Sequence, residues 1–313
     1  MFASNRSVKL LGPKYYKEFR CIADKCRHSC CIGWEIDVDG ETIEKYKSLC
    51  GGYSEKIRNT IDIDGVPHFR LAENEKCPHL DERGLCRIIS EYGEGFLCDI
   101  CREHPRFYND TPHTKEVGIG MSCEEAARII LSSDEYREML VIGEIEGEVI
   151  DTEFDATAYR EKLYEILSSS EITYTEKLAN LYDIFGFSLA SIPDEEYAEL
   201  LDALEYLDES HRTMFGVYSS ALKTPKECEK ALERALAYFI YRHCTSAENE
   251  LEFLATFGFS LFCERLLASL FNANKARNID EMADLARILS EEIEYSEENT
   301  EAIKAFFTDK SSE

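Results

Sequence analysis

The chain has 313 residues, of which 44% are hydrophobic and 11% aromatic, and its formal net charge is −27. This apolar content is ample for a packed core and excludes an intrinsically disordered chain. Residues 1–125 carry 18 Lys and Arg against 22 Asp and Glu, whereas residues 126–313 carry 17 against 40, a net charge of −23. Such a field repels nucleic acid and anionic membranes, so we expect neither as a partner. It either attracts basic, lysine-rich protein surfaces or only keeps acidic helices soluble.

The start of the chain does not resemble a targeting signal, because four Lys or Arg side chains interrupt the first 17 residues. The apolar window 257–271 contains Glu264 and Arg265, which argues against a membrane-spanning helix. We therefore expect a cytoplasmic protein, a compartment in which thiols stay reduced.

Short strands and turns are predicted around the cysteines of the first part, and strands are expected only there. Residues 34–38 alternate between apolar and polar side chains, which is typical of a strand. Residues 81–84 have the composition of the turn of a small hairpin over residues 77–88. A helix at 41–49 and a further strand at 66–71 complete the elements expected here.

From Ser122 onward the pattern changes to helices. Ser122 and Glu125 have the spacing of a capping box, which predicts a helix running through Leu131. Apolar side chains within residues 231–240 recur with helical periodicity. Further helices are expected at 156–169, 174–190, 194–208, 248–272, 279–294 and 298–308.

The predicted fold is therefore mainly α, with a small cysteine-rich, metal-stapled N-terminal module that contains short β-strands, and a helical C-terminal half. We expect the module to span residues 1–130 and an acidic helical region to span residues 131–313. No linker or low-complexity segment separates the two, so a single shared core stays open.

The thirteen cysteines, ten of them before residue 125, carry the main chemical signal. Four thiols fall within eleven residues in the run Cys21-x4-Cys26-x3-Cys30-Cys31. In a reducing compartment such crowding favours metal ligation over disulfides, because a bound cation neutralises neighbouring thiolates. Sulfur ligands select zinc or an iron–sulfur cluster over magnesium or calcium, and both need four ligands, so the choice of metal stays open.

The cysteines before residue 125 outnumber the ligands of one site, so some are expected to support the others. The expected ligands and their immediate support are Cys21, Cys26, Cys30, Cys31, Cys77, Cys86, Cys101 and Cys123. Cys98 is a further candidate because it forms a CxxC pair with Cys101, for which thiol redox chemistry is an alternative. His28, His79 and His104 lie near cysteines and are candidates for mixed ligation, although such histidines more often lie at the surface or support a ligand. The three cysteines after residue 125 are expected to be ordinary core thiols.

Within residues 15–130 the motifs occur in an order that resembles a known family. They are Phe19-Arg-Cys21, Cys30-Cys31-x-Gly33-Trp34-x-Ile36, Cys77-Pro-His-Leu80, Gly84-Leu-Cys86, Cys101-x3-Pro105-Arg106 and Ser122-Cys123-Glu-Glu-Ala126-Ala127-Arg128. This pattern resembles the flagellin lysine-N-methylases (FliB-like), within the wider cysteine-rich superfamily of zinc- or iron-chelating domains marked by a CxxxCxxCC-type run.

The resemblance implies methyl transfer from S-adenosylmethionine to lysine side chains of flagellin, with a cysteine-ligated iron–sulfur cluster (4Fe-4S) or zinc in the enzyme. Arg106 is the candidate for binding a carboxylate of the methyl donor. Glu35, Asp37, Tyr92 and Glu124 are candidates for accepting the lysine proton, and none of them is assigned as the catalytic residue. The alternative from another class is a non-enzymatic zinc- or iron-binding or protein-interaction module.

Overall fold

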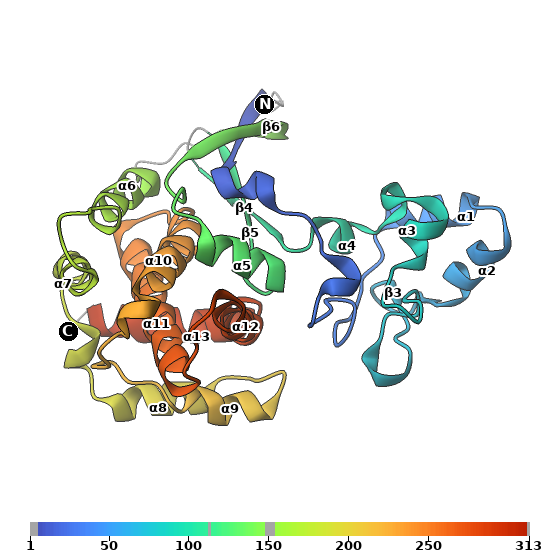
Figure 1. Ribbon diagram of the computed structural model, residues 1–313. Coiled ribbons are helices and arrows are strands. Elements are labelled where there is room, and N and C mark those ends of the chain that lie inside the picture. Colours follow the sequence, from blue (N-terminus) through green and yellow to red (C-terminus); the bar gives the residue numbers. More distant parts are fainter. Residues whose placement is uncertain (1–5, 112–113, 148–153, 312–313) are drawn as a thin grey trace. The chain divides into compact units, whose positions relative to one another are not determined.

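The computed structural model describes residues 6–111, 114–147 and 154–311, and its contacts divide the chain into two compact units. Arg20–Arg106 forms one unit, called here the cysteine-rich unit. Met1–Phe19 joins Phe107–Glu313 in the other, called here the helical unit (Figure 1). The cysteine-rich unit is thus shorter at both ends than the expected module of residues 1–130.

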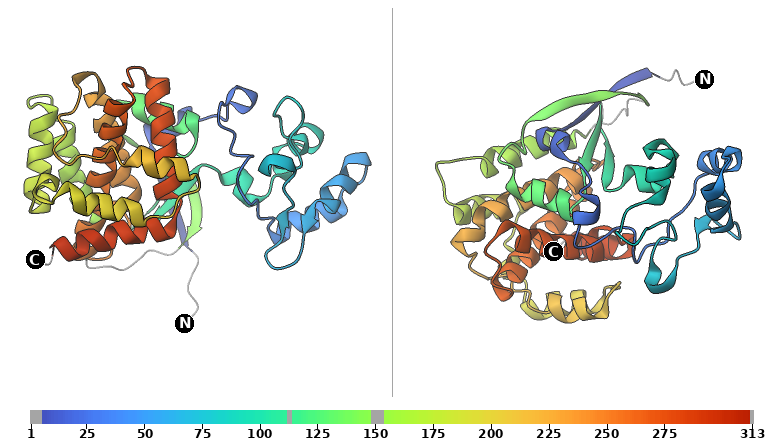
Figure 2. Two further views of the ribbon diagram at one scale, coloured as in Figure 1. Left: turned by 90° about the horizontal axis from the view of Figure 1, so that it is seen from below. Right: turned by 45° about the vertical axis from the view of Figure 1, so that its right-hand side comes forward.

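A four-stranded sheet belongs to the helical unit. Its strands are β1 (Arg6–Pro13), β4 (Arg106–Asp110), β5 (Lys115–Ile119) and β6 (Met139–Gly147), in the order β4-β5-β1-β6. β1 runs parallel to β5 and antiparallel to β6. Figures 1 and 2 show these strands gathered on one side of the helices of this unit. The expectation that strands occur only around the cysteines was therefore wrong.

The second half of the chain is helical, as predicted. Its helices are α5 (Glu124–Ser132), α6 (Ala156–Leu167), α7 (Tyr174–Phe185), α8 (Asp194–Ala203), α9 (Glu209–Phe215), α10 (Glu229–Cys244), α11 (Glu250–Ala273), α12 (Ile279–Leu289) and α13 (Glu297–Ser311). Polar side chains fix several starts: Thr173 and Glu176 form a capping box before α7, and Asn249 and Asn278 cap α11 and α12.

The capping box expected at Ser122 and Glu125 is absent, although the helix is present. α5 begins one residue later than a Ser122 cap requires, with Cys123 at the N-cap and no side-chain capping hydrogen bond to the helix start. Both carboxylate oxygens of Glu125 instead accept hydrogen bonds from Arg128, at 2.7 and 2.6 Å. The two hydrogen bonds to an ionised guanidinium outcompete the weaker bond to a backbone N–H.

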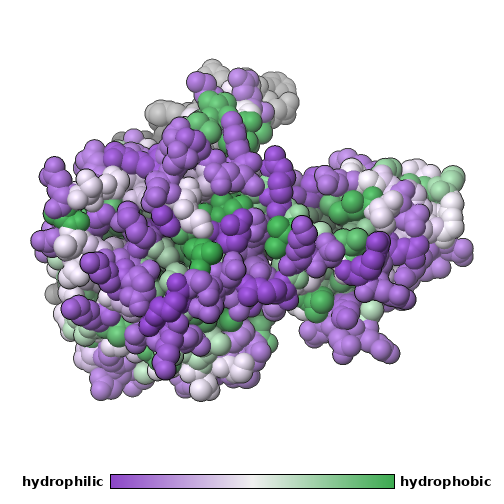
Figure 3. Space-filling model, viewed as in Figure 1, coloured by the Kyte–Doolittle hydropathy of each residue, from purple (hydrophilic) through white to green (hydrophobic). Residues whose placement is uncertain are grey.

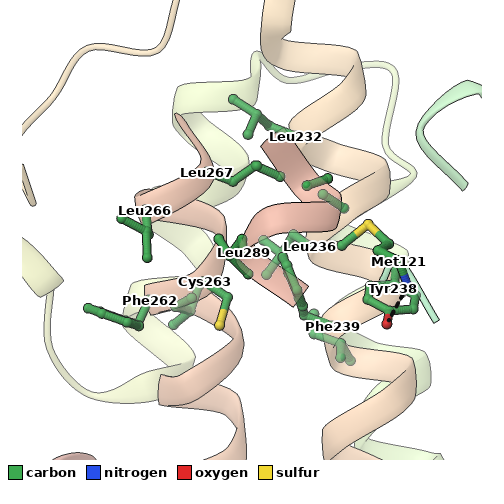
Figure 4. Close-up of a cluster of buried hydrophobic side chains, with 14 of the residues drawn as sticks. Met121, Leu232, Leu236, Tyr238, Phe239, Phe262, Cys263, Leu266, Leu267 and Leu289 are labelled. Atoms are coloured by element: carbon green, nitrogen blue, oxygen red, sulfur yellow. Dashed lines mark hydrogen bonds between the residues drawn. The ribbon is translucent and has the colours of Figure 1, made fainter. Parts of the chain in front are cut away.

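The core of the helical unit is built around α10 and α11. Apolar side chains cover every face of α11, and this helix is the only described one long and apolar enough to cross a membrane. The relevant window is 94% buried inside the protein, as expected for a core helix. Figure 4 shows Leu267 and Cys263 of α11 in one cluster with Leu289 and with Leu236 of α10. Cys228, Cys244 and Cys263 are fully buried here, which agrees with ordinary core thiols.

The cysteine-rich unit has short elements around a small core. They are α1 (Gly40–Ser48), α2 (Gly52–Asn59), β2 (Ile61–Asp62), β3 (His68–Phe69), α3 (Arg87–Tyr92) and α4 (Asp99–Glu103). The predicted turn at residues 81–84 is confirmed, because Gly84 N donates to the Asp81 carbonyl oxygen at 3.0 Å and residues 80 and 86 form a β-bridge. The strand expected at 34–38 is reduced to an isolated bridge between Asp37 and His68.

Candidate metal centre

Five thiols border the core of the cysteine-rich unit. Cys77 and Cys98 are buried members of that core, and Cys31, Cys86 and Cys101 pack against it half-buried. The apolar part of the core includes Ile36, Val38, Tyr46, Phe69 and Ile88. Thiols separated by up to 70 positions in the sequence therefore meet at one small core.

Local structure explains how the chain brings these thiols together. Cys77 N donates to the Cys31 carbonyl oxygen at 2.9 Å, which ties the first cysteine run to the Cys77-Pro78 segment. Cys86 follows the hairpin turn at the N-cap of α3, and Cys98 is the N-cap of α4, which carries Cys101 on its first turn. The N-termini of α3 and α4, whose first backbone N–H groups have no partner within the helix, thus lie beside the Cys86 and Cys98 residues.

The five thiols lie close enough to affect one another electrostatically. Burial, together with smaller contributions from the charges of Cys31, Cys86 and Cys98, raises the pKa of Cys77 to about 12, against a backbone hydrogen bond from His79 that lowers it. Burial also raises the pKa of Cys86, again with contributions from Cys31 and Cys98. These thiols oppose each other's ionisation because their negative charges would repel. A bound cation would compensate that repulsion and bind them as thiolates.

In two pairs of neighbouring thiols, a hydrogen bond within the pair lowers the pKa of one of the two sulfur atoms. A hydrogen bond from Cys30 lowers the pKa of Cys31 to about 7. A hydrogen bond from Cys101 lowers the pKa of Cys98, whereas the same bond and burial raise the pKa of Cys101. In each pair one sulfur is therefore poised to be the thiolate and the other to stay a thiol until a metal replaces the proton.

The remaining predicted ligands are more exposed. Cys30 lies beside Cys31 but is exposed, as is Cys21, and Cys26 is half-exposed, on a segment with little regular structure. Cys50, which was not predicted as a ligand, is also exposed. Cys123 is the N-cap of α5 and belongs to the helical unit.

The donor set suits a soft metal by its chemistry, because five sulfur atoms exceed the four that zinc or an iron–sulfur cluster needs. Within residues 6–111, 114–147 and 154–311, however, no three His, Cys, Asp or Glu side chains stand in a ready metal-binding arrangement. The structure therefore groups the thiols around one core without giving them a ligand geometry.

The three histidine candidates differ sharply in their surroundings. His79 is fully buried, and its two ring nitrogens lie 3.0 Å from the Tyr53 hydroxyl and 3.1 Å from Thr60 Oγ1. Because both nitrogens are occupied, His79 supports the fold beside Cys77 and is not positioned as a ligand. His104 packs against Trp34, with ring centroids 6.5 Å apart, and burial lowers its pKa to about 4. His28 is exposed.

The candidates for substrate chemistry are spread over both units. Arg106, at the start of β4, donates to the Arg102 carbonyl oxygen at 3.0 Å. Glu35 is exposed and lies 3.8 Å from His68, and Asp37 is exposed on the β-bridge beside it. Tyr92 packs on Phe96 with ring centroids 5.7 Å apart.

Glu124 is the fourth candidate proton acceptor, and it differs from the other three in its surroundings. It is buried, on the first turn of α5 in the helical unit. The four candidates thus occupy different elements, and the structure selects none of them as the base.

The fold and the thiol group together define a cysteine-rich protein with a large acidic helical unit. Residues 113–313 match the FliB lysine N-methylase C-terminal domain, and the chain belongs to that family. The match covers the helical unit beyond its first strands and includes the motif at residues 122–128, whereas the other motifs that resemble the cysteine-rich superfamily lie before it.

Three curated proteins are similar to the chain over 140 residues. The lysine-N-methylases of Salmonella typhimurium (strain LT2) and Salmonella choleraesuis (strain SC-B67) are each 26% identical, over 41% of this chain and 33% of their own length. The flagellar biosynthetic protein FliU of Salmonella muenchen is 25% identical, over 41% of this chain and 79% of its own length. The similarity thus spans about a third of each lysine-N-methylase, and no solved structure matches the chain.

Proposed function

We propose that this protein is a protein-lysine N-methyltransferase that acts on flagellin in the cytoplasm, with S-adenosylmethionine as the methyl donor. The observation that carries the proposal is the match of residues 113–313 to the FliB lysine N-methylase C-terminal domain. The names of the relatives, two lysine-N-methylases and one flagellar biosynthetic protein, support the same reaction and a flagellar substrate.

The reaction sets clear demands on the chain. The lysine ammonium first loses a proton to a base, and the neutral amine nitrogen then forms a bond to the methyl carbon while the carbon–sulfur bond of the sulfonium breaks. The products are N-methyllysine and S-adenosylhomocysteine, and the proton leaves through the base. The protein must orient the amine in line with the methyl group and exclude water, which supplies most of the rate gain in such transfers.

The metal is proposed to bind in the cysteine-rich unit. Cys31, Cys77, Cys86, Cys98 and Cys101 are the donors that the fold groups, and the exposed run with Cys21, Cys26 and Cys30 supplies further thiols. Zinc or a 4Fe-4S cluster held there would stabilise the cysteine-rich unit, whose own hydrophobic core is small. Arg106 remains the proposed partner of the methyl donor's carboxylate.

The direct test is methylation in cells. Flagellin is co-expressed with this chain and, separately, without it, and the lysine-containing peptides are compared by mass spectrometry. The proposal predicts lysine methylation that depends on the chain. Unmodified flagellin in the presence of soluble, folded protein would overturn it.

A second function is favoured by the thiol group itself. All five grouped thiols lie in residues 20–106, outside the matched segment 113–313, so the cysteine-rich unit can bind metal without any methyltransferase chemistry. Finding stoichiometric zinc or iron in a protein that never methylates lysine would favour this non-enzymatic module.

A further inference from the structure

One hairpin of the cysteine-rich unit carries two large apolar side chains in solvent. It connects β2 to β3, and its turn contains Ile63 and Val66, which are 75% and 63% exposed. Neither side chain belongs to a hydrophobic core of the described residues. We call residues 63–66 the hairpin tip. The packing of the fold gives no reason for apolar side chains at these two positions.

Such exposure is uncommon on this chain. Ile63 is the most exposed large hydrophobic residue that the structure describes, and only Leu207, at 74%, ranks between it and Val66. Figure 3 shows that apolar atoms on the visible face of the cysteine-rich unit form separate small areas on a mostly polar surface. Single exposed apolar residues are normal, whereas two on one four-residue turn offer a partner a pair of anchors.

The backbone of the hairpin tip is fixed by local hydrogen bonds. Asp64 N donates to the Asp62 carboxylate at 3.0 Å, and His68 Nδ1 lies 2.9 Å from the Val66 carbonyl oxygen. Gly65 has a φ of +83°, a conformation that a side chain would strain. A turn that is already ordered loses little conformational freedom on binding, so less of the binding energy is spent on ordering it.

The charges around the hairpin tip are mainly negative. Four carboxylates lie on or beside the hairpin, and they belong to Glu35, Asp37, Asp62 and Asp64. The first cation after the tip, Arg70, donates to the carbonyl oxygens of residues 59 and 61 at 2.9 and 3.3 Å, at the base of the hairpin. This balance suits an apolar pocket edged by Lys or Arg and disfavours an anionic membrane surface.

We propose that the hairpin tip inserts into an apolar pocket of the lysine-bearing protein substrate, whose basic side chains meet the surrounding carboxylates. The proposal rests on the proposed function and adds which surface of this chain the substrate contacts. A second copy of this chain is a poorer partner, because each copy carries a net charge of −27.

The first test measures binding without catalysis. Flagellin is immobilised and titrated with the full chain in the absence of S-adenosylmethionine. Ile63→Ser and Val66→Ser should each weaken binding about tenfold, because each removes an apolar side chain that is buried in the complex. No binding by the wild type, or equal binding by the wild type and both variants, would overturn the proposal.

Leu207→Ser is the matched control. Its side chain is as exposed as that of Ile63 but belongs to the helical unit, so the variant should bind flagellin like the wild type. Because neither tip side chain supports a core, both tip variants should keep the wild-type melting temperature followed by Trp34 fluorescence. Loss of binding at an unchanged melting temperature then reports a lost contact and not unfolding.

The charge of the tip has a separate test. Asp64→Lys should slow association with flagellin about threefold at low ionic strength and leave the dissociation rate nearly unchanged. The same reversal at the exposed Glu248, in the turn before α11, should not slow association. Association of Asp64→Lys at the wild-type rate would overturn the basic character of the partner.

Two other occupants of the tip are distinguished with the same variants. A wild-type dimer that Ile63→Ser dissociates, or binding to neutral phospholipid vesicles that Ile63→Ser abolishes, would overturn the proposal in favour of a second copy or a membrane. Each of these outcomes leaves the methyltransferase proposal to be judged by methylation alone.

Discussion

At the scale of single residues, glycines mark where the helical unit is packed most closely. A Cβ atom on Gly258 of α11 would lie 2.6 Å from the ring of Phe307 and 2.7 Å from that of Phe185. Phe185 and Phe307 themselves pack edge to face, with ring centroids 5.9 Å apart. The three helices α7, α11 and α13 can approach only because this position lacks a side chain.

Gly258→Ala should therefore destabilise the protein, although alanine is the better helix former. Helix propensity favours alanine by about 1 kcal/mol, whereas forcing a methyl group into a packed core costs about 1–3 kcal/mol. We expect a net loss of up to about 2 kcal/mol in the free energy of unfolding, measured by urea denaturation. Gly143→Ala on β6, where a Cβ meets nothing within 4 Å, is the control and should be near neutral. A stabilised Gly258→Ala variant would contradict this account of the packing.

Some residues of the candidate metal centre could be predicted from the sequence. Crowding of thiols in one segment predicted the group, and Cys31, Cys77, Cys86 and Cys101 do border one core. Cys98, which was only a further candidate, proves to be buried in that core. Proximity in the sequence did not tell which thiols of the first run turn inward, because that depends on backbone hydrogen bonds such as the one from Cys77 to Cys31.

At the scale of elements, a π-helical turn connects α12 to the rest of the helical unit. It spans Ser290–Glu294 and directly continues α12. Its buried Glu292 accepts hydrogen bonds from Leu207 N at 2.7 Å and Asp208 N at 3.1 Å, and from His211 Nδ1 at 2.5 Å. One carboxylate thus fixes the connection between α8 and α9.

This contact predicts a pH-dependent stability. The hydrogen bond to Glu292 raises the pKa of His211, with a smaller contribution from Asp208, while burial and, to a lesser extent, Arg287 oppose the increase. A raised pKa in the folded state means that the stabilisation is fully present below the ordinary histidine pKa, near 6.5, and is lost as pH rises through the folded value. The difference in free energy of unfolding between the wild type and His211→Asn should therefore be larger at pH 6 than at pH 8.5. An equal difference at both pH values would contradict it.

The sheet was the element that the sequence did not predict. β1 pairs with β5 and β6, whose residues lie more than 100 positions further along the chain. Such pairing depends on tertiary contacts that no local pattern encodes. The helices were predictable because amphipathic periodicity and caps are local, although the expected helix at 194–208 ends at Ala203 and a new one begins at Glu209.

At the scale of the whole molecule, the two units differ in how they are stabilised. The hydrophobic core of the cysteine-rich unit contains nine buried hydrophobic side chains, two of them cysteines, whereas the helical unit has an extended core around α10 and α11. Small units of this kind commonly need a metal or disulfides to stay folded. The metal is therefore expected to stabilise the cysteine-rich unit and to leave the stability of the helical unit unchanged.

Metal removal should unfold the cysteine-rich unit selectively. Trp34 is the only tryptophan of the chain and lies in that unit, so its fluorescence reports on it, whereas far-ultraviolet circular dichroism reports mainly on the helical unit. Chelation under reducing conditions should lower the melting temperature followed by Trp34 and leave the helical transition in place. Unchanged Trp34 melting after complete chelation would show that no metal stabilises the unit.

The charge asymmetry of the chain predicts a salt effect on substrate capture. Screening shortens the Debye length from about 10 Å at 0.1 M salt to about 3 Å at 1 M. If the negative charge of residues 126–313 steers a lysine-bearing substrate, the apparent KM for flagellin should rise with salt while kcat changes much less. A KM that does not respond to salt would mean that the carboxylates serve solubility and not docking.

The central claim, lysine methylation by this chain, is tested most directly with purified components. The metal-replete protein is incubated with flagellin and S-adenosylmethionine, and the flagellin is analysed by mass spectrometry for mass increments of one methyl group, localised to individual residues. Flagellin whose lysines have been chemically acetylated is the control and should gain nothing. The account predicts methyl groups on lysine side chains and a matching amount of S-adenosylhomocysteine. Folded, metal-replete protein that leaves flagellin unmodified and forms no S-adenosylhomocysteine would contradict it.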